Sequence, residues 1–137
     1  MQYKITPPTH IEDTIQLPAS KSISNRALII HALAGGNIMP ENLSTCDDTA
    51  VIARAFKDNP YEIDIMAAGT AMRFMTAYLA VTEGEHVLTG TERMKQRPIK
   101  ILVDALRFLG ADIQYTGEEG FPPLLIKGKK LKGGSVE

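Results

Sequence analysis

The sequence is most constrained by an alternation of short apolar runs with helices that begin at small polar residues. Residues 14–17 form a strand-like run, and a loop from Pro18 to Arg26 then leads into an apolar stretch, residues 27–34, which Gly35 and Gly36 end. The loop contributes the hydroxyl groups of two serines, Ser20 and Ser22, the ammonium group of Lys21 and the guanidinium of Arg26. Free N–H groups and the positive end of a helix dipole favour a phosphate or carboxylate at such a place. A serine-capped helix with solvated charges would contain the same residues, so this loop alone leaves both interpretations open.

A second junction follows the apolar run at residues 63–66. Gly69 allows a ligand to approach the backbone closely, because it has no side chain. Thr70 is placed to cap the next helix, and Arg73 lies in the first turn of that helix.

A third junction covers residues 90–98 and predicts a loop that carries Arg93, Lys95 and Arg97. Pro98 suits the first position of another helix, where its missing N–H leaves no bond unmade. Three junctions with small or basic residues at helix starts favour a site that gathers anionic groups.

The pattern of apolar residues predicts strands alternating with helices over most of the chain. Asp47 or Asp48 is the expected N-cap of the second helix. This capping role is favoured over an acid–base role for the pair. Such alternation alone indicates an α/β fold with a doubly wound sheet. The predicted strands are 11–17, 37–43, 63–66, 86–89, 112–115 and 124–127, and the predicted helices are 25–34, 48–57, 70–82 and 98–109.

Composition excludes several classes of function. The 137 residues carry a formal net charge of −1, so no overall field attracts nucleic acid or a membrane surface. The longest apolar run is too short to span a bilayer, and the first residues lack the apolar core of a signal peptide. Cys46 is the one cysteine, which rules out an internal disulfide and fits the reducing cytoplasm. Lys127, Lys129, Lys130 and Lys132 are interpreted as a solvated loop, and His10, His31 and His86 predict no metal site.

Three motifs together resemble those of the 5-enolpyruvylshikimate-3-phosphate synthase family. They are Leu-Pro-Ala-Ser-Lys-Ser-Ile-Ser-Asn-Arg at 17–26, Ala-Gly-Thr-Ala-Met-Arg at 68–73 and Arg-Met-Lys-Gln-Arg-Pro-Ile at 93–99. The likeness runs over nearly the whole chain and includes the acidic pair at 47–48 and the segment 102–111. In the sister family that acts on UDP-N-acetylglucosamine, Asn follows the motif lysine, whereas this chain has Ser22.

The resemblance implies a fold and a place in a larger protein. Members of the family have two similar α+β lobes of βαβαββ units, with parallel helices buried inside and sheets facing outward. They are about three times as long as this chain. Residues 1–137 are therefore expected to be part of an N-terminal lobe, with the rest of that lobe and the second lobe absent. Such a fragment is expected to be inactive alone and to self-associate through uncovered helix faces or an open strand edge.

The resemblance also implies a transferase activity and a set of binding residues. The family transfers the enolpyruvyl group of phosphoenolpyruvate to the 5-hydroxyl of shikimate 3-phosphate in aromatic amino acid biosynthesis, without a metal or cofactor. Lys21, Ser22 and Arg26 would bind shikimate 3-phosphate, and Lys21, Gly69 and Arg97 would bind phosphoenolpyruvate. Thr70, Arg73 and Asp48 are further candidates, and no catalytic acid or base is expected in this chain.

Two departures from the family pattern accompany the match. Ala67 stands where the family has Asn, which removes a polar side chain near the pyruvyl site. The link between Phe56 and Ile63 is shorter than the family's hairpin-bearing segment. A transferase for UDP-N-acetylglucosamine and a non-catalytic anion-binding module of the same fold remain the alternatives.

Overall fold

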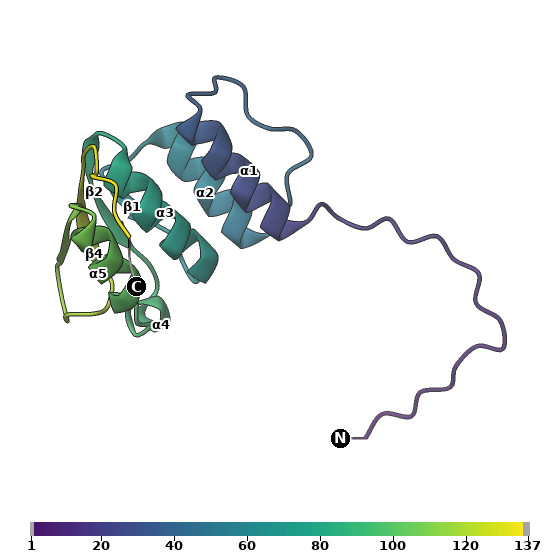
Figure 1. Cartoon of the computed structure of the whole chain (residues 1–137). Helices are drawn as coiled ribbons and strands as arrows, with labels where there is room; N and C mark the ends of the chain where they lie inside the picture. The colour runs from purple at the N-terminus through teal and green to yellow at the C-terminus, as the bar shows by residue number, and fades with distance from the viewer. Residues whose placement is uncertain (1, 136–137) are drawn as a thin grey trace.

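The computed structural model describes residues 2–135, in which helices and strands alternate (Figure 1). The expected domain 1–137 includes Met1, Val136 and Glu137, which lie outside the described residues. The elements are α1 (Lys21–Leu33), α2 (Asp47–Asp58), β1 (Glu62–Asp64), α3 (Gly69–Val81), β2 (Gly84–Thr89), α4 (Glu92–Lys95), α5 (Lys100–Phe108), β3 (Asp112–Tyr115) and β4 (Leu124–Gly128).

The strands form one mixed sheet in the order β1-β2-β4-β3. β1 and β2 are parallel, with α3 as their crossover, and the other two pairs are antiparallel. Alternate residues point to one face and are buried, as expected for a sheet that is covered on one side: Ile63, Leu88, Ile113, Leu124 and Ile126. The expected 112–115 and 124–127 hairpin is confirmed, and β3 is an edge strand.

Helix α3 is the centre of the core. It contacts α1, α2, α5 and strands β2 and β4, and its buried side chains lie on several sides: Ala71, Met72, Met75, Leu79 and Ala80. α1 and α2 lie side by side next to it, away from the sheet (Figure 1). The burial of helices that the resemblance implies is therefore met on several sides of α3, although Val81 at its C-terminal end is 43% exposed.

The same prediction is wrong for α1. Only its face with Ser24, Asn25 and Leu28 is buried, while Ile30 is 66% and Leu33 58% exposed. Apolar composition shows that a helix can be buried, but burial also needs a neighbour, and α1 has neighbours on one side only.

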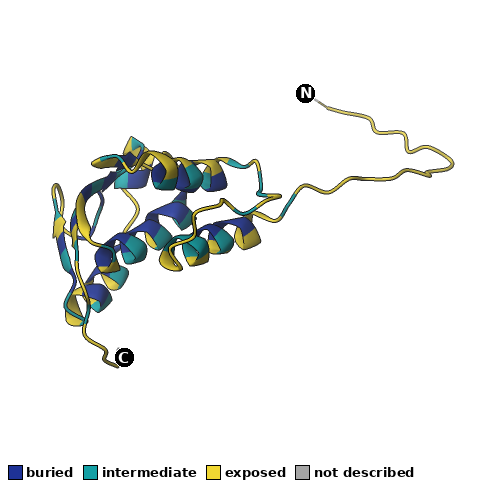
Figure 2. Cartoon of the chain, turned by 90° about the horizontal axis from the view of Figure 1, so that it is seen from above, coloured by how far each residue is buried: buried dark blue, intermediate teal, exposed yellow. Residues whose placement is uncertain are grey.

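Two predicted strands are also wrong. Residues 11–17 lie in an extended, exposed N-terminal segment, which Figure 2 shows running far from the rest of the chain. Residues 37–43 form turns and bends between α1 and α2. A strand is stable only beside another strand, and in the described structure neither segment has one.

The predicted helices exist, but several of their starts differ. The first begins at Lys21, with Ser20 as N-cap, rather than at Asn25. Cys46, not Asp47 or Asp48, is the N-cap of α2, and both aspartates lie in its first turn. The last begins at Lys100, so Pro98 precedes the helix instead of opening it.

Candidate functional site

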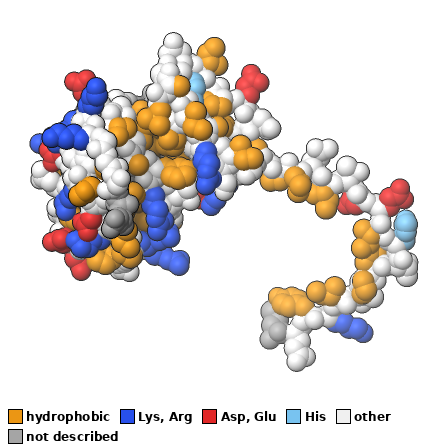
Figure 3. Space-filling view, in the orientation of Figure 1, with side chains coloured by type: hydrophobic (Ala, Val, Ile, Leu, Met, Phe, Trp, Pro, Cys, Tyr) orange, Lys and Arg blue, Asp and Glu red, His pale blue; other side chains and the backbone are white. Residues whose placement is uncertain are grey.

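The first turns of α1, α2 and α3 lie at one end of the molecule because the three helices run parallel. Lys21 in the first turn of α1 bonds to Asp48 in the first turn of α2. Arg26, one turn further along α1, lies over the ring of Phe74 in the second turn of α3. In Figure 3, Lys and Arg side chains gather on the side of the molecule where α1 and α3 begin. Three positive helix ends and several cations thus face one region.

Lys21 and Asp48 form an ion pair across the first two helices. The Nζ atom of Lys21 lies 3.0 Å from Oδ1 of Asp48, and the two side chains are 48% and 18% exposed. The hydrogen bond to Asp48, followed by its charge, raises the pKa of Lys21 above its usual value. Lys21 is therefore a charged ammonium group that is paired with one carboxylate and is half exposed to solvent.

Ser22 and Arg26 extend this group of residues towards α3. The Nη1 atom of Arg26 donates to the backbone oxygen of Ser22 at 3.0 Å, and its guanidinium lies 5.6 Å from the centre of the Phe74 ring. Both residues are exposed. The stacked guanidinium keeps donors free for a phosphate, because an aromatic face takes up none of them.

Gly69 and Arg97 are in direct contact at the start of α3. A Cβ atom on Gly69 would lie 2.5 Å from Nη1 and 2.9 Å from Cζ of Arg97. Arg73 also bonds to this glycine, donating from Nη1 to the Gly69 oxygen at 3.3 Å. The structure thus brings together residues that are 28 positions apart in the sequence, and their binding of a ligand stays a prediction.

The segment before Arg97 differs from the predicted loop. Residues Glu92–Lys95 form the short helix α4, capped by Thr91, whose Oγ1 accepts from the backbone N–H of Met94 at 3.4 Å. Lys95 pairs with Glu92 at 2.8 Å. Thr70 is not the N-cap of α3; that position is Ala68, and Thr70 is half-buried in the first turn.

Sequence reasoning missed a buried hydrogen bond behind the ion pair. Oγ1 of Thr49 donates to Oδ1 of Asn25 at 2.7 Å, and both residues are almost fully buried. Cys46 Sγ lies 3.3 Å from the same hydroxyl. Burial raises the pKa of the Cys46 thiol. Hydrogen bonds with Ser44 and Thr49 together lower this pKa by more than burial raises it, so the net shift is downward. The polar residues Asn25 and Thr49 inside otherwise apolar helix faces were the available signal.

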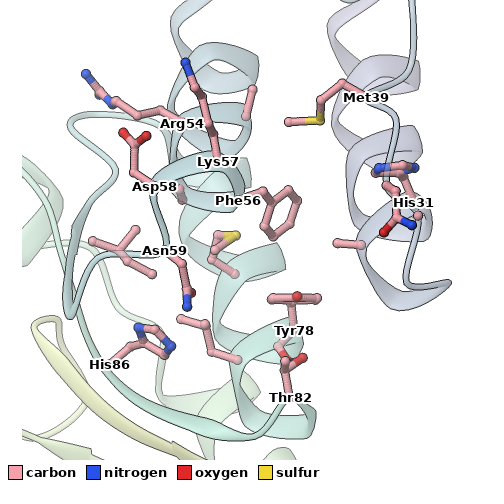
Figure 4. A pocket seen from close by; sticks show the side chains of 18 of the residues that line it. His31, Met39, Arg54, Phe56, Lys57, Asp58, Asn59, Tyr78, Thr82 and His86 are labelled. Carbon is pink, nitrogen blue, oxygen red and sulfur yellow. The ribbon is translucent and has the colours of Figure 1, made fainter.

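A large cavity lies at the opposite ends of these helices. Its volume is about 860 Å³, and Figure 4 shows His31, Phe56, Tyr78 and His86 around it. The Nδ1 atom of His86 is hydrogen-bonded to the Pro60 oxygen at 2.9 Å. None of the predicted substrate-binding residues lines this cavity, so we do not take it as the substrate site.

Two features are absent from residues 2–135. No helix there is long and apolar enough to cross a membrane. Within the same residues, no three His, Cys, Asp or Glu side chains come together as they would to hold a metal ion.

Comparison with known proteins gives one consistent family. The family model described as EPSP synthase (3-phosphoshikimate 1-carboxyvinyltransferase) matches residues 5–59 and 58–137. The 3-phosphoshikimate 1-carboxyvinyltransferase of Bacteroides fragilis is 62% identical over 136 residues, which cover 99% of this chain and 33% of that protein. An enzyme of the same name from Haemophilus influenzae is 42% identical over an alignment of 162 residues, which covers 97% of this chain and 38% of that protein.

Solved structures agree with these matches. EPSP synthase from Acinetobacter baumannii superposes with a TM-score of 0.75 at 25% identity, over 89% of this chain and 34% of that structure. The mixed α/β fold expected from the motifs is thereby confirmed. The chain spans about a third of the length of the relatives it matches.

The comparisons also explain the short link before β1. The two parts of the family match meet at residues 58–59, and the Haemophilus influenzae alignment extends over 162 positions, more than the 137 residues present here. That relative therefore has residues that this chain lacks. Asp58 and Asn59, where the two parts of the family match meet, line the cavity of Figure 4.

Proposed function

The chain belongs to the EPSP synthase (3-phosphoshikimate 1-carboxyvinyltransferase) family, and from this premise we propose that it supplies the anion-binding part of such an enzyme. The whole protein would transfer the enolpyruvyl group of phosphoenolpyruvate to the 5-hydroxyl of shikimate 3-phosphate and release phosphate. Residues 1–137 would be part of its N-terminal lobe, in the cytoplasm.

One observation supports this proposal above the others: the Arg97 guanidinium lies directly on Gly69 at the N-terminus of α3. A planar guanidinium can donate two parallel hydrogen bonds to a phosphate or carboxylate. The free N–H groups at the beginning of α3 would contribute further donors to the same anion. Gly69 matters there because any side chain would collide with Arg97.

In this proposal, each of the two substrates is bound by its own pair of residues. Arg97 and Gly69 would bind the phosphoenolpyruvate, with Arg73 and Thr70 beside them. Ser22 and Arg26 would bind shikimate 3-phosphate, and Lys21, held by Asp48, would bridge the two substrates. Two polyanions repel each other, and these cations offset that repulsion while fixing the reacting groups together.

The reaction itself would be an addition followed by an elimination. The 5-hydroxyl oxygen bonds to C2 of the enolpyruvyl group and loses its proton, while C3 gains one. The tetrahedral intermediate then loses inorganic phosphate, and a proton leaves C3 to restore the double bond. We propose that the groups that carry these protons lie outside residues 2–135.

Phosphate release by a whole protein containing this chain tests the proposal. We expect release with phosphoenolpyruvate and shikimate 3-phosphate, and none when UDP-N-acetylglucosamine replaces shikimate 3-phosphate. The polypeptide 1–137 alone should match the blank. Release with UDP-N-acetylglucosamine would favour the sister activity, and no release with either acceptor would favour a non-catalytic anion-binding module.

A further inference from the structure

Met66 lies in a backbone conformation that its side chain disfavours. It is the first central residue of a turn from Ile65 to Ala68, which the Ala68 N–H closes by donating to the Ile65 oxygen at 3.0 Å. Its φ angle is +55°, in the left-handed region where residues other than glycine, asparagine and aspartate are uncommon. Something in the surroundings must hold the turn in this form.

Two hydrogen bonds hold the Met66 backbone. Oδ1 of Asp64 accepts from the Met66 N–H at 2.7 Å, and the Met66 oxygen accepts from the Thr91 N–H at 3.0 Å. The Met66 side chain is 47% exposed, so packing around it contributes little to holding the turn. The backbone of this one residue is therefore fixed from both sides by polar contacts.

These contacts connect the two halves of the proposed phosphoenolpyruvate site. On one side the turn leads through Ala67 and Ala68 into Gly69 and α3. On the other side Thr91 caps α4, and the N–H of Arg97 donates to the Met94 oxygen at 3.0 Å. The Arg97 side chain in turn lies on Gly69, so the two segments meet again at this contact. A shift of Met66 would thus move Gly69 relative to Arg97.

We propose that Asp64 is a positioning residue for this site: its carboxylate holds Met66 in the left-handed conformation and so keeps Gly69 under Arg97. The inference rests on the proposed function for its ligand, phosphoenolpyruvate. The conformational part of the inference is independent of the proposed function, because the turn at Met66 can be measured without ligand. Asp64 itself does not touch the substrate.

The ligand-free test is amide hydrogen exchange and NMR of the Met66–Gly69 segment. Asp64→Ala should speed exchange of the Met66 amide by about 10-fold, because that amide loses its bond to a charged acceptor. Exchange of the Ala68 amide, which closes the turn by donating to the Ile65 oxygen, should speed up as the turn loosens. The same substitution should also shift the Gly69 amide signal. Asp64→Asn keeps an oxygen acceptor and should restore most of the protection.

Glu62→Ala is the matched control. Glu62 lies two residues earlier on the same exposed face of β1, and both carboxylates act on the charge of Lys95. The control therefore removes the same charge from the same strand without touching the Met66 N–H. Changes that appear equally in Glu62→Ala and Asp64→Ala would overturn the inference, because they would come from charge alone.

The binding test uses phosphoenolpyruvate and the whole protein. We expect Asp64→Ala to weaken its binding by about 10-fold and Glu62→Ala to leave it unchanged. In a Met66→Gly background, glycine adopts the turn unaided, so Asp64→Ala should lose most of its effect. An equal loss in both backgrounds would contradict the inference. If the unaltered protein does not bind phosphoenolpyruvate while Asp64→Ala still releases the turn, the proposed function fails and the positioning role stands.

Discussion

At the scale of single residues, the proposed site relies on the difference between the planar guanidinium of arginine and the compact ammonium of lysine. In the proposed site, the planar guanidinium of Arg97 would make a two-point contact with an anion, whereas Lys21 is a compact ammonium paired with one carboxylate. Their neighbours differ too, since Arg97 lies on a glycine and Arg26 on the ring of Phe74. These differences make the roles of the cations separable by substitution.

Arg97→Lys should weaken phosphoenolpyruvate more than shikimate 3-phosphate in the whole protein, because a two-point contact becomes one. A hydrogen bond to a charged group contributes about 1.5–3 kcal/mol, which corresponds to roughly 10- to 150-fold in affinity. Arg26→Ala should show the reverse preference. Calorimetric titrations in which both variants lose both ligands equally would refute this division of roles.

Gly69→Ala should weaken the binding of phosphoenolpyruvate to the whole protein and, more strongly, the binding of bulkier analogues of that ligand. The added methyl group would lie 2.5 Å from Arg97 Nη1, so the guanidinium must move away from the helix end. Gly117→Ala is the control, because a Cβ there meets only Pro123 Cδ, at an ordinary 3.8 Å. Unchanged affinity in Gly69→Ala would mean that this glycine serves the turn and not the site.

At the scale of helices and strands, α1 and α2 are joined by a polar contact inside an apolar interface. The Thr49 hydroxyl donates to Asn25 Oδ1, and in the described structure Asn25 Nδ2 has no hydrogen-bond partner. The ion pair of Lys21 and Asp48 lies one turn earlier on α1 and one residue earlier on α2, so we expect the buried contact to help set the relative position of the two charged residues. It thereby affects the site without touching a ligand.

Thr49→Val should lower the free energy of unfolding by about 1–3 kcal/mol, because it leaves the buried Asn25 oxygen without its donor. Thr82→Val is the matched control: its hydroxyl donates to the Tyr78 oxygen at 2.9 Å at the half-buried end of α3, where water can replace it. Chemical denaturation of both variants gives the comparison. Equal losses would show that the Asn25 contact has no special weight.

The sequence predicted the longer helices and the hairpin because their patterns are local, whereas the short helix α4 was predicted as a loop. Helix α1 begins earlier than predicted because Ser20, not the later polar residues, accepts the capping bond from the Ile23 N–H. The strands expected at 11–17 and 37–43 failed because pairing is non-local, and no apolar pattern states whether a partner strand exists. The left-handed turn at Met66 gave no signal, since methionine is not a residue that favours it.

The candidate site was predictable to a similar extent. Small and basic residues at helix starts identified Lys21, Gly69 and Arg97, and the structure brings the last two into contact. Their division between two substrates came from the family resemblance and stays a prediction. The contributions of Asp64 and Asn25 depend on backbone and side-chain contacts that only a folded chain defines.

At the scale of the whole molecule, an apolar groove between α1 and α3 is open to solvent. Its volume is about 270 Å³, and Ile30, Leu33 and Val81 on its rim are 66%, 58% and 43% exposed. Its remaining lining residues are Arg26, Ile29, Phe74, Ala77 and Tyr78. Exposed apolar side chains that lie side by side in this way favour association with another apolar surface.

We therefore expect the polypeptide 1–137 to self-associate through this groove at micromolar concentration. Leu33→Glu should reduce the association, because it places a charge in the apolar contact. Ile101→Glu, on α5 at a site 89% exposed, should leave it unchanged. Sedimentation would decide: a monomeric unaltered chain with a cooperative melt would show that the groove needs no cover.

The most direct test of the central claim is a crystal structure of the whole protein with phosphoenolpyruvate and shikimate 3-phosphate. We predict the phosphoenolpyruvate beside Arg97 and the first N–H groups of α3, with shikimate 3-phosphate beside Ser22 and Arg26 and Lys21 between the two. Both ligands should lie at the end where α1, α2 and α3 begin. Ligands bound in the cavity at the other ends of these helices, beside His31 and His86, would contradict the account.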